Sequence, residues 1–158
     1  MTLPKRFGIW GNIDKSSFWE ALPKIISWSK KNDLELHLTS RILSHTNGLQ
    51  LKEKEIRGKN DMSELDFMLV LGGDGTFLSL ARIIENSNTP ILGIHLGDLG
   101  FLAKVTLKDL FNRLDQVAMG SYVLEERILV EAIIEKNGKK INQVALNDFV
   151  ICNAQSHR

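Results

Sequence analysis

The pattern of apolar and polar residues along the chain predicts strands that alternate with helices. Residues 67–72 are apolar without polar alternation, which is typical of a strand buried on both faces of a parallel sheet. Residues 6–12 and 91–95 predict two further short strands, and residues 34–39 alternate as a strand exposed on one face near a sheet edge. The sequence therefore predicts an α/β fold with a Rossmann-like parallel sheet in its N-terminal part.

The first predicted helix covers residues 17–31, where apolar residues recur on one face. Ser17 and Glu20 have the spacing of a capping box at its start. Pro23 lacks an N–H group and clashes with the preceding turn, so we expect it to kink the helix or to move the start towards the proline. Both tryptophans of the segment are expected to pack in the core.

Helical spacing also appears at residues 76–86 and 107–116. Residues 40–63 are polar and charged without a sustained period. We expect this stretch to be a mobile connection that holds one short helix.

The C-terminal part of the chain has a different pattern. Residues 127–135 and 139–146 predict strands on either side of Asn137-Gly138, a strong signal for a two-residue hairpin. The apolar residues 149–152 predict one more strand. Three strands without intervening helices predict that a second, antiparallel β region begins between residues 104 and 120.

Composition and charge exclude several classes of function. The chain has 158 residues, 43% of them hydrophobic, and 20 basic against 19 acidic residues give a net charge of +1. This balance gives no reason to expect nucleic acid or an anionic membrane as a partner, and we expect a cytoplasmic protein. Cys152 is the single cysteine, and His37 and His45 have no second ligand at metal spacing, so we expect neither a disulfide nor a metal site.

Candidate chemistry lies directly after the apolar run of residues 67–72. Gly72, Gly73 and Gly75 allow positive φ angles and the close approach of another molecule to the backbone. Successive N–H groups in such a turn, next to a helix N-terminus, favour phosphate, and the hydroxyl of Thr76 adds a donor. Asp74 would repel phosphate unless it accepts a sugar hydroxyl or holds a cation. The loop therefore points to phosphoryl transfer.

Spacing alone leaves a structural alternative open for this loop. A glycine turn between strand and helix is common in α/β folds, and an aspartate beside it is often a turn former or helix cap. The loop lacks the Lys-Ser or Lys-Thr pair of a Walker loop, and Leu78 stands where a dinucleotide fingerprint has its third glycine.

The glycine loop resembles a known kinase superfamily. Gly-Gly-Asp-Gly-Thr at residues 72–76 is similar to the motif of NAD kinases, of diacylglycerol and sphingosine kinases and, more distantly, of 6-phosphofructokinases. Residues 93–102 resemble the second glycine motif of the NAD kinase family, and Asn147-Asp148 resembles its Asn-acid motif. The chain departs from the family at His95, where many members have Asn, and at Asp148, where Glu is commoner. The three motifs in this order favour the NAD kinases.

The resemblance implies a reaction and a set of site residues. NAD kinases transfer the γ-phosphoryl group of ATP to the 2′-hydroxyl of the adenosine ribose of NAD, which gives NADP. It implies Asp74 as the general base or orienting acceptor for that hydroxyl, with backbone donors of the glycine loop on phosphate. Phe101 would stack on the adenine base, Asn147 would read the adenine edge, and Asp148 would accept from ribose hydroxyls. Arg158 is a further candidate near the NAD phosphates.

The resemblance also implies a two-domain arrangement. Residues 1–103 would form the α/β nucleotide-binding domain and residues 104–158 the opening part of a β-rich NAD-binding domain. Family members continue with further strands, so we expect the chain to be truncated before the end of that domain and to be incompetent as a kinase alone. Mg²⁺ or another divalent metal would arrive with ATP. NAD and ATP are the expected partners, and we expect a homo-oligomer.

Two alternatives to an NAD kinase remain at the level of sequence. A lipid kinase of the diacylglycerol or sphingosine type shares the first glycine motif but fits the other two motifs less well. A non-catalytic nucleotide-binding fragment would bind the same ligands without turnover.

Overall fold

The structure of the protein is a computed structural model, which describes residues 3–45, 49–84, 87–97 and 100–152. The chain divides into two compact units, one ending at Leu124 and the other starting at Glu125. Among the described residues, no helix combines the length and the apolar character needed to cross a bilayer.

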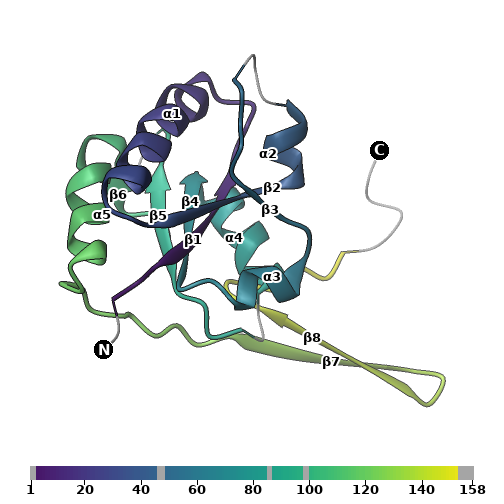
Figure 1. Ribbon diagram of the computed structural model, residues 1–158. Helices are drawn as coiled ribbons and strands as arrows, with labels where there is room; N and C mark the ends of the chain where they lie inside the picture. The colour runs from purple at the N-terminus through teal and green to yellow at the C-terminus, as the bar shows by residue number, and fades with distance from the viewer. Residues whose placement is uncertain (1–2, 46–48, 85–86, 98–99, 153–158) are drawn as a thin grey trace. The chain divides into compact units, whose positions relative to one another are not determined.

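The first unit is built on one parallel sheet of six strands in the order β3-β2-β1-β4-β5-β6 (Figure 1). Every neighbouring pair runs parallel. The strands are β1 (Arg6–Gly11), β2 (Glu35–Thr39), β3 (Lys54–Ile56), β4 (Phe67–Gly72), β5 (Ile91–His95) and β6 (Val105–Thr106). The predicted α/β fold is confirmed. The four strands expected before residue 100 are all present, and β4 is buried along its whole length.

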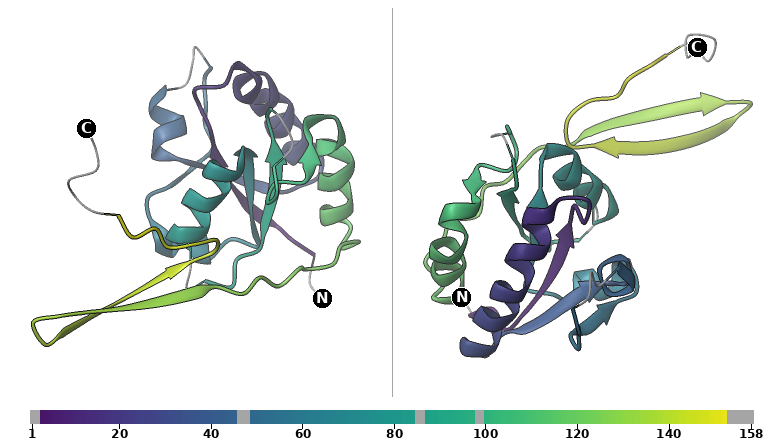
Figure 2. Two further views of the ribbon diagram at one scale, coloured as in Figure 1. Left: turned by 180° about the vertical axis from the view of Figure 1, so that it is seen from behind. Right: turned by 90° about the horizontal axis from the view of Figure 1, so that it is seen from above.

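Helices cover both faces of this sheet (Figures 1 and 2). They are α1 (Ser16–Lys31), α2 (Ser40–His45), α3 (Lys59–Ser63), α4 (Asp74–Ile83), the 3₁₀ turn η1 (Leu107–Asp109) and α5 (Leu110–Ala118). α1 and α5 pack their apolar residues on one face of β1, β2 and β4. α3 and α4 pack on the opposite face, against Ile56, Met68 and Val70. Because successive side chains of a strand point to opposite faces, β4 supplies both cores.

The first helix differs from the prediction at its start. α1 begins at Ser16 after Lys15, and no side chain caps it, so the capping box expected from Ser17 and Glu20 does not form. The expected shift of the start towards Pro23 is also wrong, because the proline lies inside the helix. Its side chain is exposed, so water can satisfy the carbonyl that the missing N–H leaves free. The buried apolar face of α1 supplies the stability that the cap would have given.

The connection expected at residues 40–63 is more ordered than predicted. The described part contains α2, β3 and α3 in place of one short helix. Each element is short and buries few residues, with Ile42, Ile56 and Met62 as the apolar anchors. Single anchors produce no periodic pattern, so the sequence alone could not reveal these elements.

The second unit is a β-hairpin of β7 (Val130–Lys136) and β8 (Lys139–Ala145), which pair antiparallel. Asn137 and Gly138 form its turn with φ angles of 52° and 72°, as the two-residue hairpin signal predicts. The strand predicted at residues 149–152 is wrong, because these residues are described without strand structure. A strand needs a neighbour for its ladder of hydrogen bonds, and the described sheet pairs only β7 with β8.

Candidate functional site

The candidate site lies at the carboxyl ends of the central strands. β1 pairs with β2 on one side and with β4 on the other, so the chain reverses its direction across the sheet between β1 and β4. Open α/β sheets bind ligands at such a switch point, outside the carboxyl ends of the strands. β4 ends there with Gly72, and the neighbouring β5 ends with His95, the register partner of Gly72 (Figure 1). The two glycine loops therefore lie close together, with Gly100 against the carboxylate of Asp74.

The turn between β4 and α4 is tighter than the sequence suggests. α4 begins at Asp74 and not at Thr76, and Gly73 precedes it as the N-cap residue. Gly73 has φ −99° and ψ −170°, an extended conformation, and the positive φ angles expected for the loop glycines do not occur. The first N–H groups of a helix lack partners within it, so this end of α4 presents free donors at the switch point.

The glycines of the loop therefore allow other atoms to approach the backbone closely. A Cβ atom on Gly72 would lie 2.3 Å from Oγ1 of Thr76, whose side chain packs over the glycine. Gly73 and Gly75 are exposed, and a Cβ atom on either would meet nothing within 4 Å. Their missing side chains leave the backbone of the first helical turn open to a ligand.

Asp74 binds the backbone of a second loop with its carboxylate. Oδ2 accepts the N–H of Phe101 at 2.8 Å, and Oδ1 accepts the N–H groups of Leu102 at 3.1 Å and Ala103 at 3.3 Å. The hydrogen bond from Phe101 is the main cause that lowers the pKa of Asp74. The other two amides and the charge of His95 also lower this pKa, while partial desolvation opposes them. Asp74 is therefore ionised at neutral pH.

Gly100 makes this contact possible, a role that no pattern in the sequence indicates. A Cβ atom on Gly100 would lie 2.2 Å from Oδ1 of Asp74, closer than any real contact. A glycine is thus required next to the carboxylate for steric reasons. Its place inside the second glycine motif was the only available signal.

Phe101 follows Gly100 and is 89% exposed. A phenylalanine so open to solvent, beside an ionised carboxylate, is available to stack on a planar ligand. The predicted stacking role stays a prediction, but the ring is free to perform it.

His95 is a buried polar residue at this end of the sheet, with 4% exposure. Its Nδ1 accepts the N–H of Gly97 at 3.4 Å. The side-chain oxygen of Asn can also accept a hydrogen bond from a backbone N–H, so either residue type is able to make this contact.

The remaining predicted site residues belong to the second unit. Asn147 and Asp148 follow β8 after one intervening residue, Leu146, and are exposed. The structure does not place them relative to Asp74, so their roles stay predictions. Arg158 lies outside the described residues.

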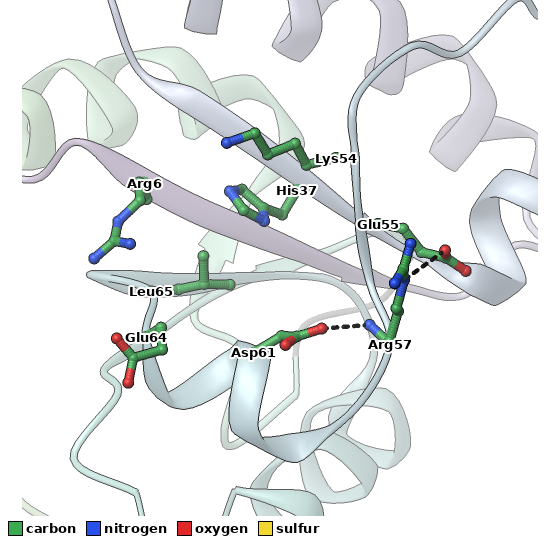
Figure 3. A pocket seen from close by; sticks show the side chains of 8 residues that line it. All are labelled: Arg6, His37, Lys54, Glu55, Arg57, Asp61, Glu64 and Leu65. Atoms are coloured by element: carbon green, nitrogen blue, oxygen red, sulfur yellow. Dashed lines mark hydrogen bonds and ion pairs between the residues drawn. The ribbon is translucent and has the colours of Figure 1, made fainter.

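A hollow of about 390 Å³ lies away from this site, near the starts of β1 and β3 (Figure 3). It is lined by Arg6, His37, Lys54, Glu55, Arg57, Asp61, Glu64 and Leu65. Three of its charged residues make ion pairs, one of them with Glu35, which lies outside the lining. Lys54 binds Glu35 at 2.8 Å, Arg57 binds Glu55 at 3.3 Å, and the backbone N–H of Arg57 donates to Asp61 at 2.8 Å. Lys54 and Arg57 are therefore each neutralised by a glutamate.

In the described part of the chain, no group of three or more His, Cys, Asp or Glu side chains is arranged to hold a metal ion. At the glycine loop, Asp74 is the acidic side chain of the first turn of α4.

The chain matches the sequence profile of the ATP-NAD kinase N-terminal domain over residues 14–122. It is 36% identical over 148 residues to the NAD kinase of Thermoanaerobacter sp. strain X514, covering 93% of this chain and 51% of that protein. It is also 36% identical over 158 residues to the NAD kinase of Hydrogenovibrio crunogenus, covering 97% of this chain and 53% of that protein. The chain thus spans about half the length of the curated relatives it matches.

Solved structures share the fold. The crystal structure of yeast NADH kinase complexed with NADH superposes with a TM-score of 0.80 and 20% identity, covering 93% of this chain and 48% of that chain. An NAD kinase from Archaeoglobus fulgidus in complex with ATP gives a TM-score of 0.53 and 17% identity, covering 81% of this chain and 40% of that chain. At these identities the likeness establishes the fold alone. The match of the domain profile to most of the sequence establishes more: the chain belongs to the NAD kinase family.

Proposed function

We propose that the protein transfers the γ-phosphoryl group of ATP to the 2′-hydroxyl of the adenosine ribose of NAD, which yields NADP. The observation that carries this proposal is the ionised carboxylate of Asp74, held at the N-terminus of α4 beside the exposed ring of Phe101. Family membership supports the same reaction, since the matched relatives are NAD kinases. It gives no support to a lipid acceptor.

Asp74 accepts the hydrogen bond of the reacting hydroxyl and orients its oxygen for in-line attack. Its lowered pKa makes it a reliable hydrogen-bond acceptor and only a weak base. A weak base is sufficient here, because phosphoryl transfer passes through a loose transition state that demands positioning and charge neutralisation more than early proton removal. Proton transfer to Asp74 then accompanies or follows the formation of the new P–O bond.

Phosphate groups bind at the open backbone of the glycine loop. The N–H groups of the first turn of α4, between Gly73 and Thr76, point towards the switch point without intrahelical partners. ATP as donor agrees with the ATP complex of the Archaeoglobus fulgidus relative. Mg²⁺ or another divalent metal enters with the nucleotide and neutralises phosphate charge. The carboxylate of Asp74 alone offers too few ligands for a dedicated protein site.

The acceptor nucleotide is recognised by its adenosine. Phe101 stacks on the adenine ring, Asn147 pairs with the adenine edge through its amide, and Asp148 accepts from ribose hydroxyls. Arg158 contributes charge near the NAD phosphates. We further propose that the full-length protein is a homo-oligomer, which analytical ultracentrifugation would establish.

The test is a direct assay of the full-length protein. With ATP and NAD, formation of NADP should be detected enzymatically, and diacylglycerol in detergent micelles should not be phosphorylated under the same conditions. A protein that binds NAD in calorimetry but forms no NADP would be a non-catalytic binding module. Labelled phosphate appearing in lipid and not in NADP would contradict the proposal.

A further inference from the structure

The carboxylate of Asp74 is tied to the segment that carries Phe101. Residues 100–103, here called the Phe101 turn, connect the region after β5 with β6. Three successive N–H groups of this turn converge on the two carboxylate oxygens, at 2.8, 3.1 and 3.3 Å. A carboxylate that accepts several backbone N–H groups binds them through charge-assisted hydrogen bonds, which are stronger than neutral ones.

The ring of Phe101 has little else to hold it. It is 89% exposed, so packing against the core does not fix its position. The turn itself is held by Ala103, which is fully buried, and by its hydrogen bonds to Asp74. The direction in which the exposed ring points therefore depends on the backbone that Asp74 holds.

We infer that Asp74 is also the positioning residue for the adenine-stacking ring, so that one carboxylate couples recognition of the base to orientation of the reacting hydroxyl. This inference rests on the proposed function. An ionised carboxylate offers about four acceptor positions. Three are used by the Phe101 turn, which leaves one for the 2′-hydroxyl of the acceptor. The distance between the stacked base and the reacting oxygen is thereby set by a single side chain.

The coupling has a consequence for acceptor specificity. A substrate must present a planar base and a hydroxyl at the separation that Phe101 and Asp74 fix. An acceptor that has the ribose hydroxyls but lacks the base binds only through Asp74 and loses the stacking contribution. Such a substrate should have a much larger KM with a smaller change in kcat.

Replacement of Asp74 by Asn gives a residue-specific signature. The side-chain amide keeps one oxygen, which is favoured at the Oδ1 position where two N–H groups converge. Its NH₂ group then faces the N–H of Phe101, where donor meets donor. In the full-length protein without nucleotide, amide exchange measured by NMR should accelerate at Phe101 by at least about tenfold and change less at Leu102 and Ala103. Unchanged exchange at Phe101 would overturn the inference.

Gly100 offers a second variant with a matched control. Gly100→Ala forces a Cβ atom against the carboxylate of Asp74, whereas at Gly97 a Cβ atom would meet no described atom within 4 Å. Gly100→Ala should therefore accelerate amide exchange across the Phe101 turn, and Gly97→Ala should leave it unchanged. We call the three hydrogen bonds from the Phe101 turn to Asp74 the clamp. Equal exchange rates in the two variants, with equal melting temperatures, would contradict it.

The link to the acceptor is tested with NAD that carries a 2′-deoxyadenosine. This ligand keeps the base and lacks the hydroxyl that Asp74 would contact. Any loss of affinity in Asp74→Asn therefore reports on the stacking of the adenine against Phe101. We expect calorimetry to give a dissociation constant about tenfold higher in Asp74→Asn than in the wild type. Equal affinities would mean that Asp74 does not position Phe101 for the base.

Failure of the proposed function would look different. If the wild-type protein bound neither NAD nor its 2′-deoxy form, NAD would not be the acceptor. The inferred coupling between base stacking and hydroxyl orientation would then also be wrong. The exchange experiment, which uses no nucleotide, would still report whether Asp74 clamps the Phe101 turn. A clamp that is confirmed by exchange but leaves nucleotide affinity untouched would overturn the coupling alone.

Discussion

The two ends of the parallel sheet each hold a carboxylate whose pKa is lowered, but by different means. At the carboxyl ends of the strands, the N–H group of Phe101 is the main cause for Asp74. At the opposite end, the pKa of Glu35 is lowered first by a hydrogen bond from the side chain of Lys54 and then by one from His37. The first charge is held by backbone and the second by other charged or polar side chains.

This difference separates a reactive site from a neutralised surface. Backbone N–H groups stabilise the charge of Asp74 without cancelling it, so the carboxylate still attracts a hydroxyl proton. Lys54 carries a full positive charge 2.8 Å from Glu35, so the pair has little net field to offer a ligand. The hollow beside Lys54 is therefore a poor candidate for catalysis despite its volume of about 390 Å³.

The largest expected effect is on catalysis at the glycine loop. In the full-length protein, Asp74→Asn should lower kcat for NADP formation by about 10²–10⁴-fold, because an amide cannot take the hydroxyl proton and presents a donor to part of the turn. Circular dichroism should show an intact fold. A decrease in kcat of less than tenfold in steady-state assays would show that Asp74 does not take part in the reaction.

The next effect concerns affinity for the acceptor. Phe101→Ala and Asn147→Ala should each weaken NAD binding by about 1–3 kcal/mol, since one loses a stacking face and the other a hydrogen-bonding edge. ATP binding should change less, and isothermal titration calorimetry with each nucleotide compares the two losses. Wild-type NAD affinity in both variants would show that Phe101 and Asn147 do not contribute to NAD binding.

Acid should weaken the carboxyl-end site in a defined pH range. The folded-state pKa of Asp74 is lowered, so the clamp contributes stability that is fully present above the ordinary aspartate pKa. That contribution is lost as the pH falls through the lowered folded-state value. Carbon-13 NMR of the Asp74 carboxyl group should give a midpoint below the ordinary aspartate range of about 4. A midpoint within the ordinary range would show that the three N–H contacts do not persist in solution.

A smaller effect is expected behind the loop, where Trp10 of β1 supports α4. Its indole N–H donates to Oγ of Ser79 at 2.9 Å, and that hydroxyl donates to the carbonyl of Thr76 at 2.7 Å. Trp10→Phe keeps most of the ring and loses the donor, which should cost about 1 kcal/mol of unfolding free energy in urea denaturation. Ser79→Ala is the partner variant. If the two losses were fully additive in the double variant, the hydrogen bond would not be the cause.

The smallest effect is expected at the opposite end of the sheet. Lys54→Met should return the pKa of Glu35 towards its ordinary value, yet the exposed pair contributes only about 0–1 kcal/mol to stability. NADP formation should be unchanged, and steady-state kinetics with NAD checks this. A large loss of activity would mean that the hollow lined by Lys54 takes part in function after all.

The sequence was most informative where the pattern was long or the turn chemistry was strong. The continuous apolar run of β4 predicted a buried parallel strand, and Asn137-Gly138 predicted the hairpin turn. It was least informative at residues 40–63, where three short elements each rest on one buried side chain. At the site, Asp74 and Phe101 were identified by their motif, while Gly100 was not, because its role is purely steric.

The sequence by itself determined the local units of this protein, namely the strand, glycine turn and helix from residue 67 to residue 83 and the hairpin of β7 and β8. Only the tertiary structure decided that Asp74 reaches the N–H group of Phe101, 27 residues further along the chain. Local propensity depends on neighbouring residues, and the sequence displays it directly. The contact of Asp74 depends on the register of β4 with β5, where Gly72 pairs with His95, and that register is set by the burial of whole strands.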